Sequence, residues 1–178
     1  FLLEHSWITG VMIGDGEDTF RELCGFYDRT QGRQPADAGL SEIAGIAYRE
    51  TFPSDKGEET VHFTKARGIT DMSKIPFCYD RMEDFSNRII YYESSRGCPF
   101  SCSYCLSSID KKLRFRNLDL VKEELQFFID QKVPQIKFVD RTFNCNHEHA
   151  MEIWRYVKEH DNGVTNFHFE ISADLLNE

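Results

Sequence analysis

The sequence has few features of membrane-embedded, secreted or nucleic-acid-binding proteins. No apolar run is long enough to span a bilayer, and no stretch has the pattern of a signal peptide. The net charge is −9, most of it within residues 1–60, which argues against a nucleic-acid-binding surface. The six cysteines are clustered rather than spread along a small secreted scaffold. We therefore expect a cytoplasmic protein with no membrane segment and no nucleic-acid partner.

A phosphate-binding loop is also missing. "GDGEDTF" contains Gly14 and Gly16 but lacks the Lys-Ser/Thr pair that such a loop needs, so we interpret it as a turn.

With 178 residues, 40% of them hydrophobic, the chain can bury a sizeable core. Because it begins at Phe1 and "ISADLLNE" follows an apolar run without a terminating element, we expect a fragment of a longer protein.

Residues 1–87 divide into two segments by their pattern. In residues 1–31, "GVMIGDGEDTFRELCGFYDR" predicts a short strand, a glycine turn and an amphipathic helix, which together form one βα unit. In residues 32–87, "GIAYRE" and "TVHFTKA" alternate apolar with polar residues, so we predict a β-hairpin within a linker. An irregular stretch interrupted by Pro76 follows, and we place the domain boundary near residues 67–87.

The remaining residues, 88–178, alternate strands with helices. The predicted strands "RIIYYESS", "QIKFVD" and "TNFHFEISA" are separated by the predicted helices "NLDLVKEELQFFIDQKV" and "NHEHAMEIWRYVKEH". This order predicts an α/β fold with a parallel sheet and right-handed crossovers, in either a barrel or an open sheet. "RGCPFSCSYC" follows the first strand, at the carboxyl end where α/β folds build their sites.

The cysteines of this segment, Cys98, Cys102 and Cys105, allow three interpretations. Their i, i+4, i+7 spacing would suit a buried stripe on a helix, although the intervening Gly, Pro and Ser favour an extended loop. A zinc site could be completed from "CNHEH", residues 145–149. The third interpretation is an iron–sulfur cluster, because its ligands are usually thiolates. Three cysteines on a four-iron cluster leave one iron open to a substrate or cofactor.

"CPFSCSYC" resembles the C-x3-C-x-aromatic-C motif of the radical S-adenosylmethionine superfamily, which likewise follows the first strand. The resemblance implies a 4Fe-4S cluster held by Cys98, Cys102 and Cys105, with Tyr104 beside the adenine of S-adenosylmethionine. It also implies the activity. The resemblance implies that an electron from the cluster cleaves S-adenosylmethionine to methionine and a 5′-deoxyadenosyl radical, which would abstract a substrate hydrogen atom.

The wider sequence, including "IIYYESSRGCPFSCSYCLSS" and "NFHFEISADLL", is similar to a narrower group. These are radical enzymes with an amino-terminal cobalamin-binding domain, related to the anaerobic magnesium-protoporphyrin monomethyl ester cyclase. The resemblance implies the last βα unit of such a domain in residues 1–31, a hairpin linker in residues 32–87, and the first half of a partial (β/α) barrel in residues 88–178. It further implies cobalamin in the full-length protein, a small-molecule substrate, and an electron donor such as flavodoxin or ferredoxin. We expect the isolated fragment to be inactive.

The predicted third strand alternates in character. Phe167, Phe169 and Ile171 fall on one side, and His168 and Glu170 fall on the other. In a barrel the apolar side packs under helices, so we expect His168 and Glu170 to face the lumen and bind S-adenosylmethionine. The alternative is an ordinary structural ion pair.

Asp140 ends the second predicted strand, where many enzymes of the superfamily place groups near the methionine amino nitrogen. We predict that Asp140 binds the cofactor, with Thr142 as a second candidate, although "VDRTF" departs from the commoner Gly-Gly-Glu pattern. The basic run "KKLRFR" is either a solvated loop or places Arg114 or Arg116 to bind a carboxylate of cofactor or substrate. The alternative for the whole chain is a non-catalytic, zinc-stabilised α/β binding module.

Overall fold

The chain forms two compact units, Phe1–Thr70 and Asp71–Glu178. The computed structural model describes residues 1–30, 39–49, 60–81, 84–108 and 110–176. Within these ranges, no helix combines the length and the apolar character that crossing a membrane requires.

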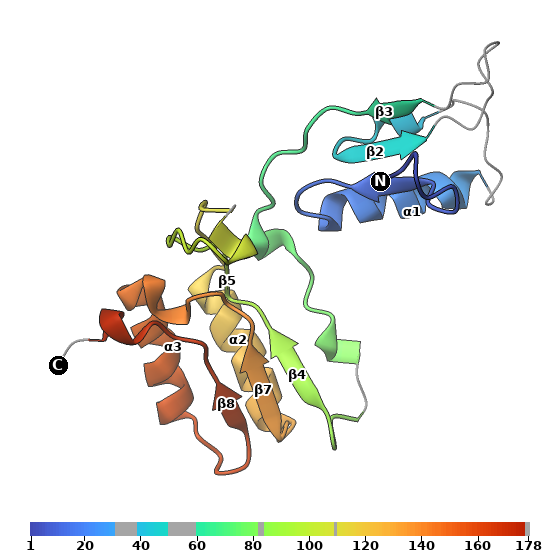
Figure 1. Cartoon of the computed structure of the whole chain (residues 1–178). Coiled ribbons are helices and arrows are strands. Elements are labelled where there is room, and N and C mark those ends of the chain that lie inside the picture. Colours follow the sequence, from blue (N-terminus) through green and yellow to red (C-terminus); the bar gives the residue numbers. More distant parts are fainter. Residues whose placement is uncertain (31–38, 50–59, 82–83, 109, 177–178) are drawn as a thin grey trace. The chain divides into compact units, whose positions relative to one another are not determined.

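The first unit is a three-stranded antiparallel sheet with one long helix (Figure 1). The strand order is β1-β2-β3, so the predicted hairpin of β2 and β3 is confirmed. The first predicted strand joins the same sheet, because Val11 of β1 pairs with Ala47 of β2. The loop between β2 and β3 lies outside the described residues. The elements are β1 (Gly10–Met12), α1 (Glu17–Arg29), a 3-10 turn (Leu40–Glu42), β2 (Ile46–Arg49) and β3 (Val61–Phe63).

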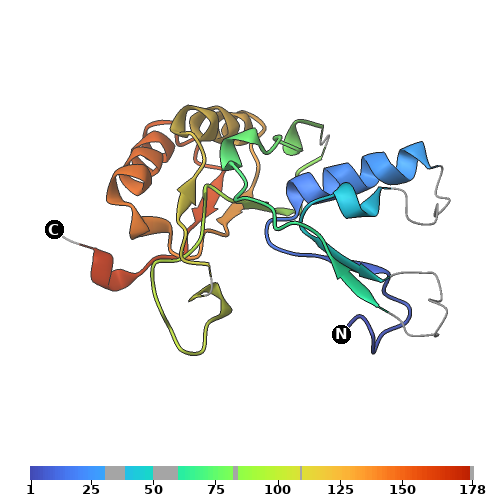
Figure 2. The same cartoon turned by 90° about the horizontal axis from the view of Figure 1, so that it is seen from above.

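The second unit is a parallel sheet of order β4-β7-β8 with two helical crossovers. Helices α2 and α3 cover one face of this sheet (Figures 1 and 2). A separate two-stranded ladder of β5 and β6 stands beyond the carboxyl end of β4. The strands and α-helices are β4 (Ile89–Tyr92), β5 (Ser95–Arg96), β6 (Arg114–Phe115), α2 (Leu118–Asp130), β7 (Gln135–Phe138), α3 (His147–Glu159) and β8 (Asn166–His168). Short 3-10 turns span Met72–Lys74, Tyr79–Arg81, Leu106–Ser108, Phe143–Cys145 and Ala173–Leu175.

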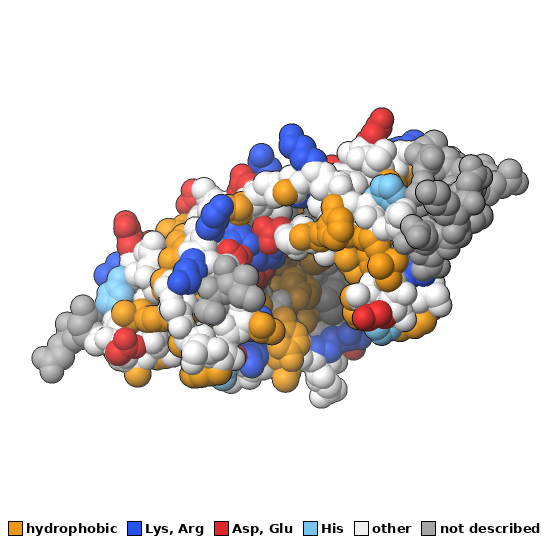
Figure 3. Space-filling model, turned by 45° about the horizontal axis from the view of Figure 1, so that its top comes forward, with side chains coloured by type: hydrophobic (Ala, Val, Ile, Leu, Met, Phe, Trp, Pro, Cys, Tyr) orange, Lys and Arg blue, Asp and Glu red, His pale blue; other side chains and the backbone are white. Residues whose placement is uncertain are grey.

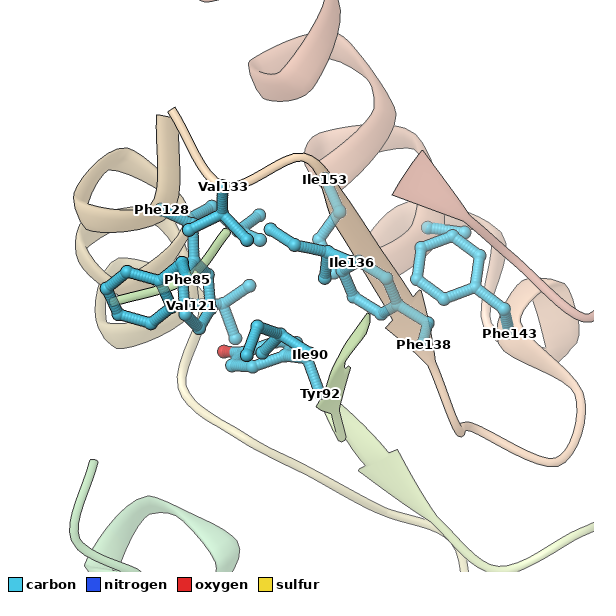
Figure 4. Packing of buried hydrophobic residues seen from close by; sticks show 12 residues of the cluster. Phe85, Ile90, Tyr92, Val121, Phe128, Val133, Ile136, Phe138, Phe143 and Ile153 are labelled. Atoms are coloured by element: carbon cyan, nitrogen blue, oxygen red, sulfur yellow. The ribbon is translucent and has the colours of Figure 1, made fainter. Parts of the chain in front are cut away.

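The core of the second unit lies between the sheet and these two helices. Alternate strand residues point toward the helices, so Ile90, Tyr92, Ile136 and Phe138 are buried while their sequence neighbours are not. They pack against apolar residues of α2 and α3 (Figure 4), which include Val121, Leu125, Phe128, Ala150 and Ile153. The opposite face of the sheet carries no helix among the described residues.

Both crossover helices begin at an asparagine that caps them. The side chain of Asn117 accepts hydrogen bonds from the backbone N–H groups of Asp119 and Leu120. Asn146 accepts one from the N–H of His149 at 3.1 Å. Such caps satisfy the unpaired N–H groups of a first turn and are each worth about 1 kcal/mol. They fix where each chain segment turns from the sheet's carboxyl end into a helix.

The surface mixes charges of both signs. On the face drawn in Figure 3, Lys and Arg side chains are interspersed with Asp and Glu. One ion pair joins α2 to α3, where Lys122 lies 2.9 Å from Glu152. Exposed pairs of this kind contribute little stability, about 0–1 kcal/mol each.

Candidate metal centre

The three-cysteine segment is a loop whose base is fastened by β5 and β6. The two strands pair antiparallel, and the N–H of Cys98 donates to the carbonyl oxygen of Asp110 at 3.0 Å. Gly97 has a φ of +96°, and a Cβ at this position would lie 2.6 Å from the carbonyl oxygen of Lys112. Only glycine fits there. The loop, yellow-green in Figure 2, extends away from the sheet.

The three cysteines lie at different depths. Cys98 is buried, Cys105 is half-buried and Cys102 is exposed. None of the six cysteines, all within the described residues, is part of a disulfide bond. Within those residues no group of three or more His, Cys, Asp or Glu side chains converges to hold a metal. The three-thiolate ligand set therefore stays a prediction.

The helix interpretation of these cysteines is wrong. The stretch from Gly97 to Cys105 contains no helix, and a single 3-10 turn begins only at Leu106. Tyr104, predicted beside the adenine, is 92% exposed on this loop. Its cofactor role stays a prediction.

Asp140 is fully buried at the carboxyl end of β7. Its Oδ1 accepts hydrogen bonds from the hydroxyls of Ser94 and Ser95 at 2.8 and 2.5 Å. Its Oδ2 accepts one from the N–H of Ser94 at 3.1 Å. Burial raises the pKa of the Asp140 carboxyl, and the serine hydrogen bonds oppose this rise. The carboxylate thus joins β7 to the chain that leads into the cysteine loop.

Thr142 continues the contact between these segments. Its hydroxyl oxygen lies 3.6 Å from the sulfur of Cys98, and both residues are buried. Its hydroxyl also donates to the carbonyl oxygen of Arg141 at 2.9 Å. "VDRTF" places Thr142 just beyond a strand that ends at the site, and cofactor binding by Thr142, the second candidate after Asp140, stays a prediction.

His168 and Glu170 lie on the sheet face that the helices leave open. Lys137 of β7 pairs in register with His168, and its ammonium lies 3.2 Å from the Glu170 carboxylate. Phe167 and Phe169 pack against the core as predicted, so this alternation is confirmed. The prediction was wrong for Ile171, which lies three residues beyond the end of β8 and is 45% exposed. The ion pair fits the structural alternative, and cofactor binding by Glu170 stays a prediction.

Within the described residues, those of the zinc alternative form no group of three or more side chains that could hold a metal. His147 Nε2 lies 2.6 Å from the carbonyl oxygen of Leu175, and His149 Nε2 lies 3.3 Å from the Ser94 hydroxyl. Cys145 is half-buried, and burial raises the pKa of its thiol. The two histidines thus have other partners in the fold, whereas the nearby charges of Asp140 and Cys98 also raise the pKa of the Cys145 thiol.

Arg116 does bind a carboxylate through two points, but the carboxylate belongs to the protein. Its guanidinium contacts Glu124 of α2 at 2.9 Å through Nε and at 2.5 Å through Nη2. Both side chains are 8% exposed, so the solvated-loop interpretation is also wrong for Arg116. Arg114 pairs with Asp110 at 2.9 Å.

Comparison with protein families finds a match within the second unit. Residues 92–178 match the model of the radical SAM superfamily. An uncharacterised methyltransferase of Pyrococcus horikoshii is 27% identical over 157 residues, which cover 85% of this chain and 32% of that protein. The anaerobic magnesium-protoporphyrin IX monomethyl ester cyclase of Rubrivivax gelatinosus is 29% identical over 138 residues, covering 73% of this chain and 23% of the cyclase. The chain therefore spans no more than about a third of either relative.

A solved structure has a similar fold. The radical S-adenosylmethionine methyltransferase TsrM of Kitasatospora setae superposes with a TM-score of 0.58 at 19% identity. The match covers 91% of this chain and 31% of TsrM. That enzyme has also been solved with cobalamin and a [4Fe-4S] cluster bound. At this level of identity the likeness shows a shared α/β fold.

Proposed function

Residues 92–178 belong to the radical SAM superfamily, and from this premise we propose that the chain carries the first half of a partial (β/α) barrel that cleaves S-adenosylmethionine at a 4Fe-4S cluster. The observation that carries the proposal is the loop after β4, which holds Cys98, Cys102 and Cys105 at the carboxyl end of a parallel sheet. The proposed ligands are these three thiolates.

The donor set fits an iron–sulfur cluster. Three thiol side chains lie within one loop, none is consumed in a disulfide, and two of them are accessible or partly accessible. Thiolates are the usual ligands of such clusters, and a loop extending from a fastened base has room to wrap one. Binding requires the loop to bring the three sulfurs together around the metal. When bound, the cluster would supply the electron that cleaves S-adenosylmethionine.

The chain's own residues would orient the cofactor on the open face of the sheet. Glu170 and His168 lie on this face beside Lys137, and no helix among the described residues covers them. A carboxylate accepts strong hydrogen bonds from ribose hydroxyls or an ammonium group. Glu170 would exchange its exposed contact with Lys137 for such donors. Phe167 and Phe169, partly buried on the other face, pack against the core and hold this segment in place.

We extend the proposal to cobalamin and methyl transfer in the full-length protein. The Pyrococcus relative is a methyltransferase by name, and TsrM, whose fold is similar, has been solved with cobalamin. The Rubrivivax cyclase keeps ring closure open as an alternative reaction. The substrate is a small molecule, and the reducing electron would come from a flavodoxin or ferredoxin.

The test is anaerobic reconstitution of the full-length protein with iron and sulfide. We expect about four irons per chain. Replacing Cys98, Cys102 or Cys105 with Ala should abolish the cluster signal in electron paramagnetic resonance. Cys24→Ala and Cys78→Ala are matched controls, since both residues are exposed and lie outside the loop. Normal clusters in the loop variants would refute the ligand assignment, and stoichiometric zinc without iron would favour the binding module.

A further inference from the structure

The end of β7 holds the cysteine loop at two points, and each contact has a different chemistry. Asp140 binds the backbone and hydroxyl groups of Ser94 and Ser95, which precede the loop. Thr142 contacts the sulfur of Cys98 itself. The first contact fixes a chain segment, and the second touches a proposed metal ligand.

The Asp140 carboxylate has little capacity left for a cofactor. A carboxylate offers about four acceptor positions, and the two serines already occupy three. The hydroxyl of Ser94 gives its one proton to Asp140, so His149 Nε2 must be the donor in its contact with Ser94. These residues are buried. Their hydrogen bonds form a brace that keeps the end of β7 against the start of the loop.

The Thr142 hydroxyl lies between two acceptors. The carbonyl oxygen of Arg141 is at 2.9 Å, and the Cys98 sulfur is at 3.6 Å, within hydrogen-bonding range for sulfur. While Cys98 is a thiol, its S–H can donate to the hydroxyl oxygen. A metal-bound cysteine is a thiolate, which can only accept. In that state the Thr142 hydroxyl can rotate so that its O–H donates a hydrogen bond to the Cys98 sulfur.

We propose that Thr142 is a positioning residue for the Cys98 sulfur and tunes the reduction potential of the cluster by donating a hydrogen bond to it. The inference rests on the proposed function, because it needs Cys98 to be a cluster ligand. Hydrogen bonds to cluster sulfurs and their cysteine ligands are among the factors that set the potential. Such a bond stabilises the more negatively charged, reduced cluster. Thr142 therefore raises the potential.

The experiment is a redox titration of the reconstituted full-length protein, followed by electron paramagnetic resonance. Thr142→Val keeps the shape of the side chain but loses the hydroxyl, so its midpoint potential should shift to a more negative value. Thr142→Ser keeps the hydroxyl and should stay near the wild-type potential. Thr165→Val is the control, because Thr165 is also buried but precedes β8, at the opposite end of the sheet.

The outcomes separate this inference from the proposed function. If the wild-type protein binds no cluster, both are refuted. If all variants hold a normal cluster and Thr142→Val titrates at the wild-type potential, the tuning role alone is refuted. Should Thr142→Val fail to bind a cluster, Thr142→Ala and Thr142→Ser decide, and equal potentials for these two would overturn the inference. A similar shift in Thr165→Val would also overturn it.

Discussion

Arg116 and Glu124 form a buried ion pair that joins the chain after β6 to the first turns of α2. Two guanidinium nitrogens meet the two carboxylate oxygens at 2.9 and 2.5 Å. The Tyr92 hydroxyl donates to the same carboxylate at 2.5 Å. Burial raises the pKa of Tyr92, and the charge of Glu124 raises it further, so the phenol remains a neutral donor. The guanidinium also donates to the carbonyl oxygens of Met72 and Ile75.

Glu124→Gln should destabilise the second unit strongly. An amide cannot balance the guanidinium charge, and removing one partner of a buried pair typically costs about 3–5 kcal/mol. Chemical denaturation should show a lower free energy of unfolding by roughly this amount. Glu123→Gln is the matched control, since the neighbouring Glu123 is exposed. Equal stability of the two variants would show that the pair contributes nothing.

Gly97→Ala should disrupt the base of the cysteine loop. The new methyl group would meet the backbone oxygen of Lys112 at 2.6 Å, and the φ of +96° adds strain. Gly163→Ala is the control, because Gly163 has a φ of +68° with no atom within 4 Å of an added Cβ. The control should lose only about 1–2 kcal/mol, the conformational cost. The unfolding temperature and the iron content after reconstitution should both be lower in Gly97→Ala than in Gly163→Ala. Equal values in the two variants would contradict the predicted clash.

The sequence predicted the elements of the second unit well, because each carries a local signal. The apolar periodicity of α2, together with Asn117 and Pro134 at its ends, defines a helix without reference to the rest of the chain. The alternation of Phe167 and Phe169 likewise identified the buried face of β8. The short β5 and β6 were missed, since two-residue strands have no period to detect.

The contacts around the site could not be predicted, because they join residues far apart in sequence. Asp140 accepts from serines more than 40 positions earlier, and nothing in "VDRTF" indicates those partners. For Arg116 the sequence suggested a carboxylate of the cofactor or substrate, but its partner is Glu124 on the next helix. The sequence indicated that both side chains would be charged and polar, but not which groups they would meet. Only the packing of the sheet decides which groups meet them.

Stability should decrease as the pH falls below about 6.5, because of His149. Burial lowers the pKa of His149 from its usual 6.5, so the folded state favours the neutral ring. The unfolded chain binds a proton first as the pH falls, so the stabilisation is complete above pH 6.5 and is lost below it.

Denaturation at several pH values across this range measures the effect. His149→Gln keeps an N–H donor for Ser94 and should make the free energy of unfolding depend less on pH. His160→Gln, at an exposed position, should leave this dependence unchanged. An unchanged slope in His149→Gln would exclude this histidine as the cause. Asp140 acts in the opposite direction at lower pH, because burial raises the pKa of its carboxyl. The comparison of variants isolates the histidine.

Glu170→Gln should weaken the binding of S-adenosylmethionine to the reconstituted full-length protein. The carboxylate lies on the open face of the sheet and makes a partly exposed contact with Lys137, which a cationic or hydroxyl donor can replace. A charge-assisted hydrogen bond contributes about 1.5–3 kcal/mol, so we expect the dissociation constant to rise about 10-fold or more. Isothermal titration calorimetry with S-adenosylmethionine under anaerobic conditions measures this. Glu159→Gln, at the exposed far end of α3, should bind like the wild type. If Glu170→Gln retains both the cluster and wild-type affinity, Glu170 is only the structural partner of Lys137.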